Sequence, residues 1–335
     1  MAPSPFGLQC EAGGFYIDPW RPVSCAVITH GHSDHARLGS DLYVCHRLTA
    51  PILRKRLGDV AIHAVEYGER LIKNSVTISL HPAGHVLGSA QARVEKDGDV
   101  WVASGDYKLE ADGVCAPFEP LRCRVFITES TFALPIYRWR PQAEIFSDVN
   151  GWWRNNAERE LASIIYAYSL GKAQRILAHL DPAIGQIYCH GAIEPMNAIH
   201  RDAGVRLPAT RSVGEAAKKA FAGAMILAPP SAAGSAWLRR FGDYSDALAS
   251  GWMQVRGNRR RRGLDRGFVL SDHADWPELL EAIAATGAQR VLATHGSSGP
   301  LTRYLRERGL DATALETRDG DETMSEDAAA TPDPL

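Results

Sequence analysis

Residues 30–35 read His-Gly-His-Ser-Asp-His, so three histidines and one aspartate fall within six positions. They directly follow an apolar stretch, residues 25–29, which predicts a strand with the cluster on the loop at its end. Side chains at alternate positions of an extended loop project to the same side, so His30 and His32 could hold one cation while Asp34 and His35 face a second. Imidazole nitrogens with carboxylate oxygens suit zinc, manganese or iron(II). A polar surface loop is the alternative interpretation.

A metal centre needs ligands from other parts of the chain. Three later apolar stretches each end in a histidine or an aspartate beside glycine or another small residue, which allows the backbone to approach a crowded centre. The expected ligand sets are His30, His32 and His85 for a first metal, Asp34, His35 and His295 for a second, and Asp106 as the bridge between them. The isolated histidines are interpreted as structural or exposed: His46, His63, His81, His179 and His200.

The elements that must position these ligands change in kind along the chain. Short strand-like segments dominate the first third: 15–17, 25–29, 42–44, 61–65, 76–80, 90–94, 100–103 and 125–128. One short helix is expected at 51–57. After residue 141 we expect a helix at 142–155, a strand at 163–168, a helix at 171–180 and further alternation to about residue 260. From residue 268 the pattern is strand, helix 277–285, strand 290–294, helix 301–308 and strand, so the middle is expected to be an insertion into a domain formed by both ends.

Composition sets broader bounds. With 335 residues, 45% hydrophobic and 23% charged, the chain is typical of a globular protein with a sizeable core. It has no apolar run of transmembrane length and no signal-peptide pattern at its start, so we expect a cytoplasmic protein without a membrane partner. Six cysteines without a pairing pattern predict reduced thiols. Residues 319–335 carry six acidic and no basic residues and predict a disordered tail. The arginine-rich run at 256–266 is either a solvated loop or a contact for a phosphate backbone.

The motifs together resemble the metallo-β-lactamase fold, through residues 30–35 followed by His85 and Asp106. More narrowly they resemble its β-CASP branch of nucleic-acid-processing enzymes, which includes the messenger-RNA 3′-end nuclease, RNase J and Artemis. The stretches that carry this likeness are 128–131, 169–174, 271–275 and 294–296. Closer still, residues 129–139 and 265–276 look like the bacterial ligase-associated DNA exonucleases. The likeness spans about residues 10–316, and it departs from the wider branch in its short cap and in Asp272, where a small residue is usual.

The resemblance implies an α/β (α+β) fold with an αββα sandwich. Residues 1–140 and 268–318 would form the metallo-β-lactamase domain, residues 141–267 an inserted short β-CASP cap, and residues 319–335 the disordered tail. This division agrees with the insertion expected from the pattern of elements.

The implied chemistry is hydrolysis of a phosphodiester bond. Two divalent metal ions, zinc or manganese, would activate water for in-line attack on phosphorus, with Asp34 among the catalytic ligands. We expect His273 to protonate the leaving oxygen, and Glu129 to hydrogen-bond His273 and raise its pKa. An ordinary surface carboxylate is the alternative interpretation of Glu129.

Further residues could contact substrate. Lys172 begins the expected helix at 171–180, where backbone amides favour an anion, so a phosphate could bind there with Ser169 or Lys172; ordinary packing of strand on helix is the other interpretation. Arg138 and Arg140 flank a tryptophan and could bind single-stranded nucleic acid. Arg260, in the arginine-rich run, could guide the phosphate backbone of the nucleic acid toward the metal ligands.

The expected function is a metal-dependent DNA exonuclease in repair. Its substrate would be single-stranded DNA or DNA with a free end, and the resemblance implies functional association with an ATP-dependent DNA ligase and a helicase. An RNA-processing nuclease is the first alternative. A small-molecule hydrolase of the lactamase or thioesterase kind is disfavoured because it has no need of Glu129 and His273. A binding module that has lost its metals is disfavoured because no ligand is missing.

Overall fold

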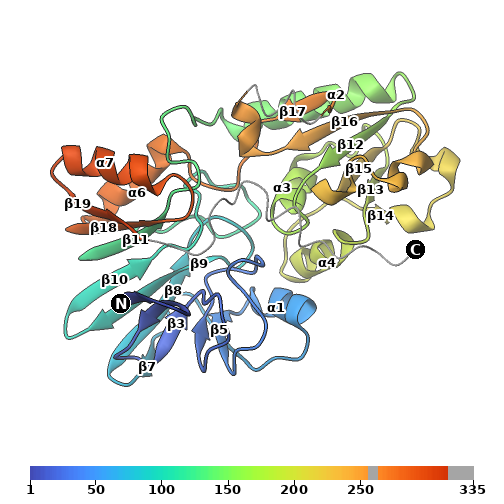
Figure 1. Cartoon of the computed structure of the whole chain (residues 1–335). Coiled ribbons are helices and arrows are strands. Elements are labelled where there is room, and N and C mark those ends of the chain that lie inside the picture. The colour runs from blue at the N-terminus through green and yellow to red at the C-terminus, as the bar shows by residue number, and fades with distance from the viewer. Residues whose placement is uncertain (256–262, 316–335) are drawn as a thin grey trace. The chain divides into compact units, whose positions relative to one another are not determined.

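The computed structural model describes residues 1–255 and 263–315, which form two compact units (Figure 1). One unit comprises Met1–Arg138 and the return that starts at Asp272; the other comprises Trp139–Ser271. Arg260 and the tail expected at 319–335 lie outside the described residues. Among the helices that are described, none is long and apolar enough to cross a membrane.

The first unit contains two sheets. In spatial order, one consists of β1 (Ala2–Ser4), β2 (Gly7–Cys10), β3 (Phe15–Ile17), β4 (Ala26–Val27), β5 (Tyr43–His46) and β6 (Ile62–Val65). The other consists of β19 (Asp311–Ala314), β18 (Arg290–Thr294), β11 (Val125–Glu129), β10 (Asp99–Ala103), β9 (Ala90–Lys96), β8 (Val76–Pro82) and β7 (Leu71–Lys73).

Alternation of side chains along the strands builds four layers in this unit. Val27 of β4 and Ile127 of β11 belong to the core between the two sheets. Their neighbours in sequence point the other way: Ile28 packs with helix α1 (Ala50–Leu57), and Phe126 packs with helices α6 (Trp276–Thr286) and α7 (Ser298–Glu307). The order of layers is therefore helix, sheet, sheet, helix.

The strand directions bring one end of several strands to the same edge. Strands β10, β11 and β18 are parallel, and β8 runs with them because it is antiparallel to β9, which is antiparallel to β10. Their carboxyl ends therefore meet at one edge of the sheet, and the residues at or just after these ends include His85, Asp106, Glu129 and His295.

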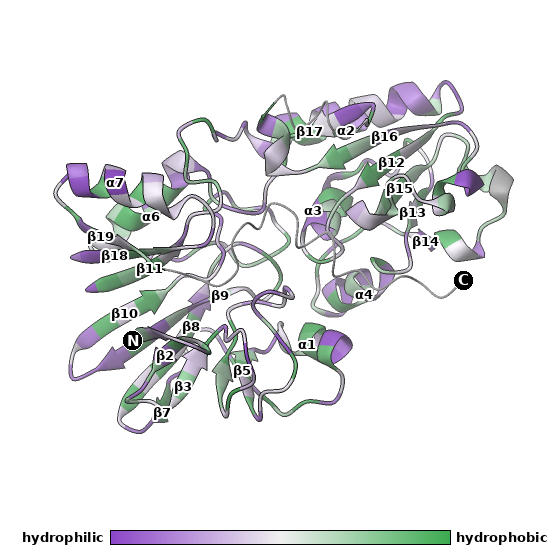
Figure 2. Cartoon of the chain, viewed as in Figure 1, coloured by the Kyte–Doolittle hydropathy of each residue, from purple (hydrophilic) through white to green (hydrophobic). Residues whose placement is uncertain are grey.

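The second unit is built on a parallel sheet. Its order is β14 (Arg211–Ser212), β13 (Ile187–Cys189), β15 (Met225–Ala228), β12 (Ala162–Tyr166), β16 (Tyr244–Ala249) and β17 (Arg266–Phe268). Helices α2 (Gln142–Ala157) and α3 (Lys172–His179) cover one face, and α4 (Glu194–Asp202) follows β13. In Figure 2 the central strands are largely green, whereas α2 carries both colours, as expected for a helix with one buried face.

The mixed α/β class is confirmed, with two differences in detail. The five expected helices are present as α1, α2, α3, α6 and α7. The strand expected at 25–29 is limited to Ala26–Val27, because the Thr29 amide bonds the side chain of Asp18 and leaves the ladder. Beyond α4 the expected α-helices are wrong: the described connections are short 3₁₀ segments such as Pro230–Ala232 and Gly251–Gln254, in a stretch broken by proline and glycine.

Candidate metal centre

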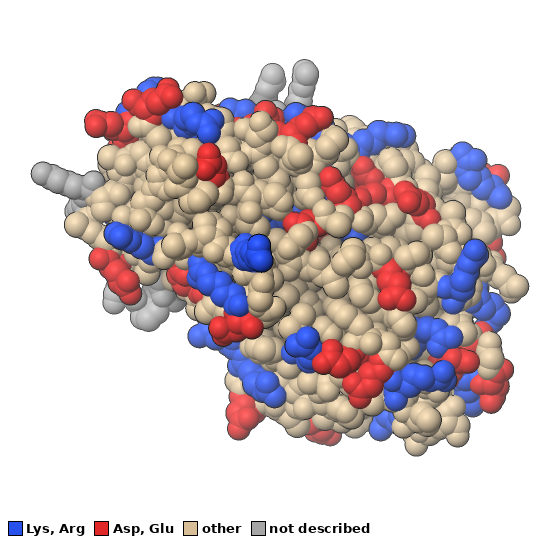
Figure 3. Space-filling model, turned by 180° about the vertical axis from the view of Figure 1, so that it is seen from behind, with Lys and Arg blue, Asp and Glu red and all other residues tan. Residues whose placement is uncertain are grey.

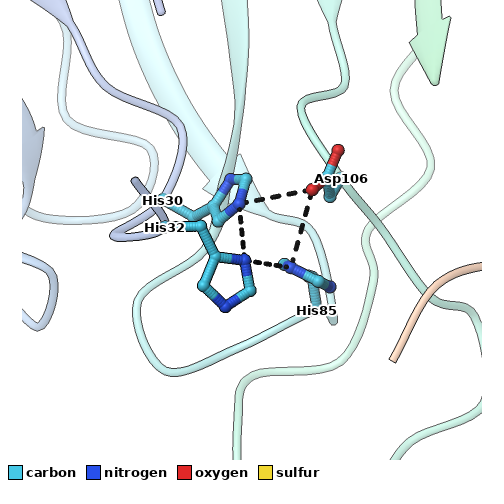
Figure 4. A group of neighbouring side chains, drawn as sticks. All are labelled: His30, His32, His85 and Asp106. Carbon is cyan, nitrogen blue, oxygen red and sulfur yellow. Dashed lines mark hydrogen bonds and ion pairs between the residues drawn. The ribbon is translucent and has the colours of Figure 1, made fainter. Parts of the chain in front are cut away.

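Four side chains bring their donor atoms into one small volume: His30, His32, His85 and Asp106 (Figure 4). His32 Nδ1 lies 3.1 Å from His30 Nε2 and 3.2 Å from His85 Nε2. Asp106 Oδ2 lies 3.3 Å from His30 Nε2 and 3.7 Å from His85 Nε2. Four ligands placed tetrahedrally at about 2.0 Å from a zinc ion are separated by about 3.3 Å. The donors therefore have the spacing of ligands to a single cation.

The protonation of these histidines also fits a metal. Burial lowers the pKa of His30 well below its ordinary value. Burial, with the charge of His273, lowers the pKa of His85 to about 3. Because an imidazole must be neutral to coordinate a metal, the protein holds both rings in the form that binds.

Hydrogen bonds on the far side of the rings set their orientation. His85 Nδ1 donates to the carbonyl of Asp272 at 2.9 Å, which leaves the lone pair of Nε2 facing the other donors. His30 Nδ1 lies 3.1 Å from Thr29 Oγ1, which itself donates to Asp18. Partners of this kind fix the tautomer and the angle of a metal-binding histidine.

A second set of donors adjoins the first through Asp106. His35 Nε2 lies 3.4 Å from Asp106 Oδ2 and 3.5 Å from Asp34 Oδ2, and the ring centroids of His35 and His295 are 5.4 Å apart. His35 Nε2, Asp34 Oδ1 and Asp106 Oδ1 are buried and form no hydrogen bond within the described residues. Polar atoms buried in this way are costly unless something satisfies them, and a divalent cation would do so. Asp106 is near donors of both sets, as a bridging ligand must be.

Asp18 supports this second set and is missed by the sequence analysis. Its Oδ2 lies 2.8 Å from His35 Nδ1, and its two oxygens accept from the hydroxyl and the amide of Thr29 at 2.5 and 2.8 Å. The contact turns His35 Nε2 toward Asp34 and Asp106. Asp18 stands alone before a proline, like any turn aspartate, so neither its spacing nor its neighbours mark it.

His273 and Glu129 form a buried pair beside the first set. His273 Nδ1 lies 2.9 Å from Glu129 Oε2, and the ring centroid of His273 is 4.6 Å from that of His85. Burial alone would lower the pKa of His273, but the charges of Glu129 and Asp106 raise it well above its ordinary value. Glu129 is 1% exposed and also accepts from the Tyr107 amide at 2.8 Å, so its interpretation as a surface carboxylate is wrong.

Two glycines let the ligand loops pass through crowded space. Gly84 precedes His85 with φ of +76°, and a Cβ there would lie 2.2 Å from the Lys108 carbonyl oxygen. Gly105 precedes Asp106 with φ of +57°, and a Cβ there would lie 2.6 Å from Thr29 Oγ1. Only glycine fits both the backbone conformation and the space at these positions.

The expected substrate-binding residues are more scattered. Ser169 and Lys172 lie at the start of α3 in the second unit, where Lys172 is buried with its ammonium group 4.4 Å from the ring centroid of Tyr168. Arg138 is exposed. Arg140 is also exposed and pairs with Glu144 and Asp148, at 3.0 Å in each case, so two carboxylates already balance its charge.

Known proteins resemble this chain over different lengths. No family model matches it. A probable DNA ligase of Opitutus terrae is 30% identical over 313 residues, which are 92% of this chain, although the chain spans only 30% of that protein. Endoribonuclease ysh-1 of Neurospora crassa is 32% identical over 131 residues, 37% of this chain and 15% of that protein. Endoribonuclease YSH1 of Saccharomyces cerevisiae is 30% identical over 134 residues, 36% of this chain and 15% of that protein.

A solved structure shares the fold. The crystal structure of a protein of unknown function from Enterococcus faecalis V583 covers 89% of this chain and 80% of its own, with a TM-score of 0.58 at 10% sequence identity. This likeness supports the architecture alone.

Proposed function

We propose that this chain, whose similarities support a metallo-β-lactamase/β-CASP family, is a metal-dependent phosphodiesterase that degrades nucleic acid. The observation that carries the proposal is the convergence of His30, His32, His85 and Asp106 at ligand spacing. The buried Glu129–His273 pair beside them supports cleavage of a bond whose leaving group needs a proton.

In this proposal the two ligand sets bind metal, and the Glu129–His273 pair transfers a proton. A pair of divalent cations, zinc or manganese, held by the two ligand sets would supply positive charge for phosphate oxygens and lower the pKa of water. Asp106 spans the two sets, and Asp34 serves the second. Glu129 Oε2 accepts a hydrogen bond from His273 Nδ1–H, so Nε2 is the atom from which His273 protonates the leaving oxygen.

We propose DNA as the substrate and an exonuclease as the activity. A relative matched over most of this chain is named a probable DNA ligase, which supports work on DNA in association with a ligase. RNA is the second candidate, because shorter matches are named endoribonucleases.

Within this proposal the first unit is the catalytic domain, and Trp139–Ser271 is the β-CASP cap. Basic and acidic side chains are interspersed on the face drawn in Figure 3, so that face offers no broad basic surface among its described residues. We therefore assign substrate contacts to particular residues: Ser169 and Lys172 for a phosphate, and Arg138 for the nucleic-acid strand.

The test is a cleavage assay with zinc or manganese on DNA and RNA strands labelled at either end. We expect metal-dependent loss of DNA from an end, and a fall of about 100-fold or more in His32→Ala, because removing even a supporting partner of a ligand costs 10–100-fold. His63→Ala is the matched control, since His63 is exposed on β6. Cleavage of RNA alone would overturn the choice of DNA, and cleavage of neither strand would overturn the proposal.

A further inference from the structure

A single buried arginine in the second unit holds both segments that lead to the first. Arg175, in α3, is 2% exposed. Its Nε and Nη2 donate to Gln142 Oε1 at 3.1 and 2.8 Å, and its Nη1 donates to the Ser271 carbonyl at 2.7 Å. Gln142 begins α2 just after the chain enters this unit, and Ser271 is the last residue before the chain leaves it.

The segment that leaves this unit runs directly into the metal centre. The peptide that contains the Ser271 carbonyl is joined to the next peptide at the Cα of Asp272, and the carbonyl of that next peptide accepts from His85 Nδ1 at 2.9 Å. Peptide groups are planar, so only the two torsions of Asp272 separate the carbonyl held by Arg175 from the carbonyl that orients His85. One residue further, His273 bonds Glu129 at 2.9 Å.

We propose that Arg175 is a positioning residue of the metal centre. It holds the Ser271 peptide, so that the Asp272 carbonyl keeps the Nδ1 proton of His85 and leaves His85 Nε2 directed at the other ligands. The guanidinium suits this task because its planar group donates to two acceptors in fixed directions, which a lysine ammonium cannot do. The inference rests on the proposed metal centre and is independent of the nucleic acid that is cut.

The first measurement is metal affinity without substrate. Zinc is titrated into the full-length chain in competition with a chromophoric chelator. Arg175→Met is expected to weaken binding about tenfold, the lower end of the cost of removing support from a metal ligand. Arg175→Lys keeps one donor for the Ser271 carbonyl and is expected to weaken zinc binding by less than Arg175→Met does. Nitrogen-15 NMR of the zinc-loaded variants adds a second readout, because the Nδ1 proton of His85 should exchange faster with water.

Arg201 provides the matched control. It lies in α4 of the same unit, donates to the Pro208 carbonyl at 2.8 Å and to Thr210 Oγ1 at 3.0 Å, and is 34% exposed. Arg201→Met should leave the zinc affinity and the exchange rate of the His85 Nδ1 proton unchanged. If Arg175→Met fails to fold, Arg175→Lys is compared with Arg201→Lys in the same way.

Three results would overturn the inference. They are unchanged zinc affinity in a folded Arg175→Met, an equal loss of zinc affinity in the Arg175 and Arg201 variants, or an unchanged exchange rate of the His85 Nδ1 proton in Arg175→Met. The proposed function is judged separately by the cleavage assay on the unmodified chain. Absence of nuclease activity together with zinc binding that depends on Arg175 would refute the function and leave the inference standing.

Discussion

At the scale of residues, the nearness of their ring nitrogens to other donor atoms distinguishes the predicted ligands from other histidines. Burial and an Nδ1 partner are not enough, because His200 is also buried and bonds the Met196 carbonyl through Nδ1. His30, His35 and His85 each bond an oxygen through Nδ1 and direct Nε2 inward, whereas His46 stacks on Tyr67 with ring centroids 3.6 Å apart. The cluster at 30–35 could be predicted as a candidate site because its polar side chains fall within six positions of the sequence. Asp18 could not, because its role depends on the chain folding back to place it beside Thr29 and His35.

The support from Asp18 gives a first prediction. Asp18→Ala should weaken binding at the second ligand set by about 10–100-fold, because His35 loses the carboxylate that orients it. Binding at the first set should change less, because its nearest link to Asp18 runs through Thr29. Metal titration followed by elemental analysis measures both, with the exposed Asp41→Ala as the control. Two ions bound as tightly as in the unmodified chain would show that Asp18 supports neither set.

The role of His273 gives a second prediction. His273→Ala and Glu129→Gln should each slow cleavage by about 10²–10⁴-fold, the usual contribution of a positioned acid or base. Metal content should change little, because neither residue belongs to the ligand sets. Single-turnover rates at saturating metal provide the measurement. A fully active His273→Ala would mean that another group protonates the leaving oxygen.

At the scale of elements, the parallel directions of β8, β10, β11 and β18 bring together residues that are up to 210 positions apart, from His85 to His295. Strand positions follow from the sequence, because short apolar runs between turn residues are local signals. The pairing order is not local, and neither is the conformation of the loops. His295, for instance, has φ of +53°, which no sequence pattern marks.

The loop after β8 supports a third prediction. Gly84→Ala should lower the free energy of unfolding by more than the roughly 1–2 kcal/mol that a left-handed alanine costs, because its Cβ also meets the Lys108 carbonyl at 2.2 Å. Gly98→Ala is the matched control: its φ of +79° is close to the +76° of Gly84, yet a Cβ there has nothing within 4 Å. Urea unfolding of the two variants measures the difference. Equal losses of unfolding free energy in the two variants would show that the backbone around Gly84 shifts to make room for a Cβ.

At the scale of the whole molecule, the proposed function assigns distinct tasks to the two units. The expected metal ligands and the expected proton donor His273 all lie in the first unit, although His273 and His295 follow the inserted second one. The change in apolar alternation and helix signals near residue 141 predicts the insertion. The alternation of apolar segments alone could not show that the connections beyond α4 are short 3₁₀ segments rather than α-helices. Proline and glycine limit the length of the helical segments there.

This division predicts where metal removal acts. At a free metal concentration of about 100 times Kd, binding should stabilise the folded first unit by about 2.7 kcal/mol. Hydrogen exchange should therefore accelerate on chelation mainly in peptides of Met1–Arg138 and of the return from Asp272, and hardly in β12 to β16. His32→Ala should show little response to chelation. Equal acceleration in both units would contradict a metal centre confined to the first.

The most direct test of the metal centre is elemental analysis of the purified, dialysed chain combined with its cleavage activity. The arrangement of His30, His32, His85 and Asp106 beside Asp34, His35 and His295 predicts two divalent ions per chain, with activity lost on chelation and regained on adding zinc or manganese. A chain that retains full activity with no bound metal would contradict the account.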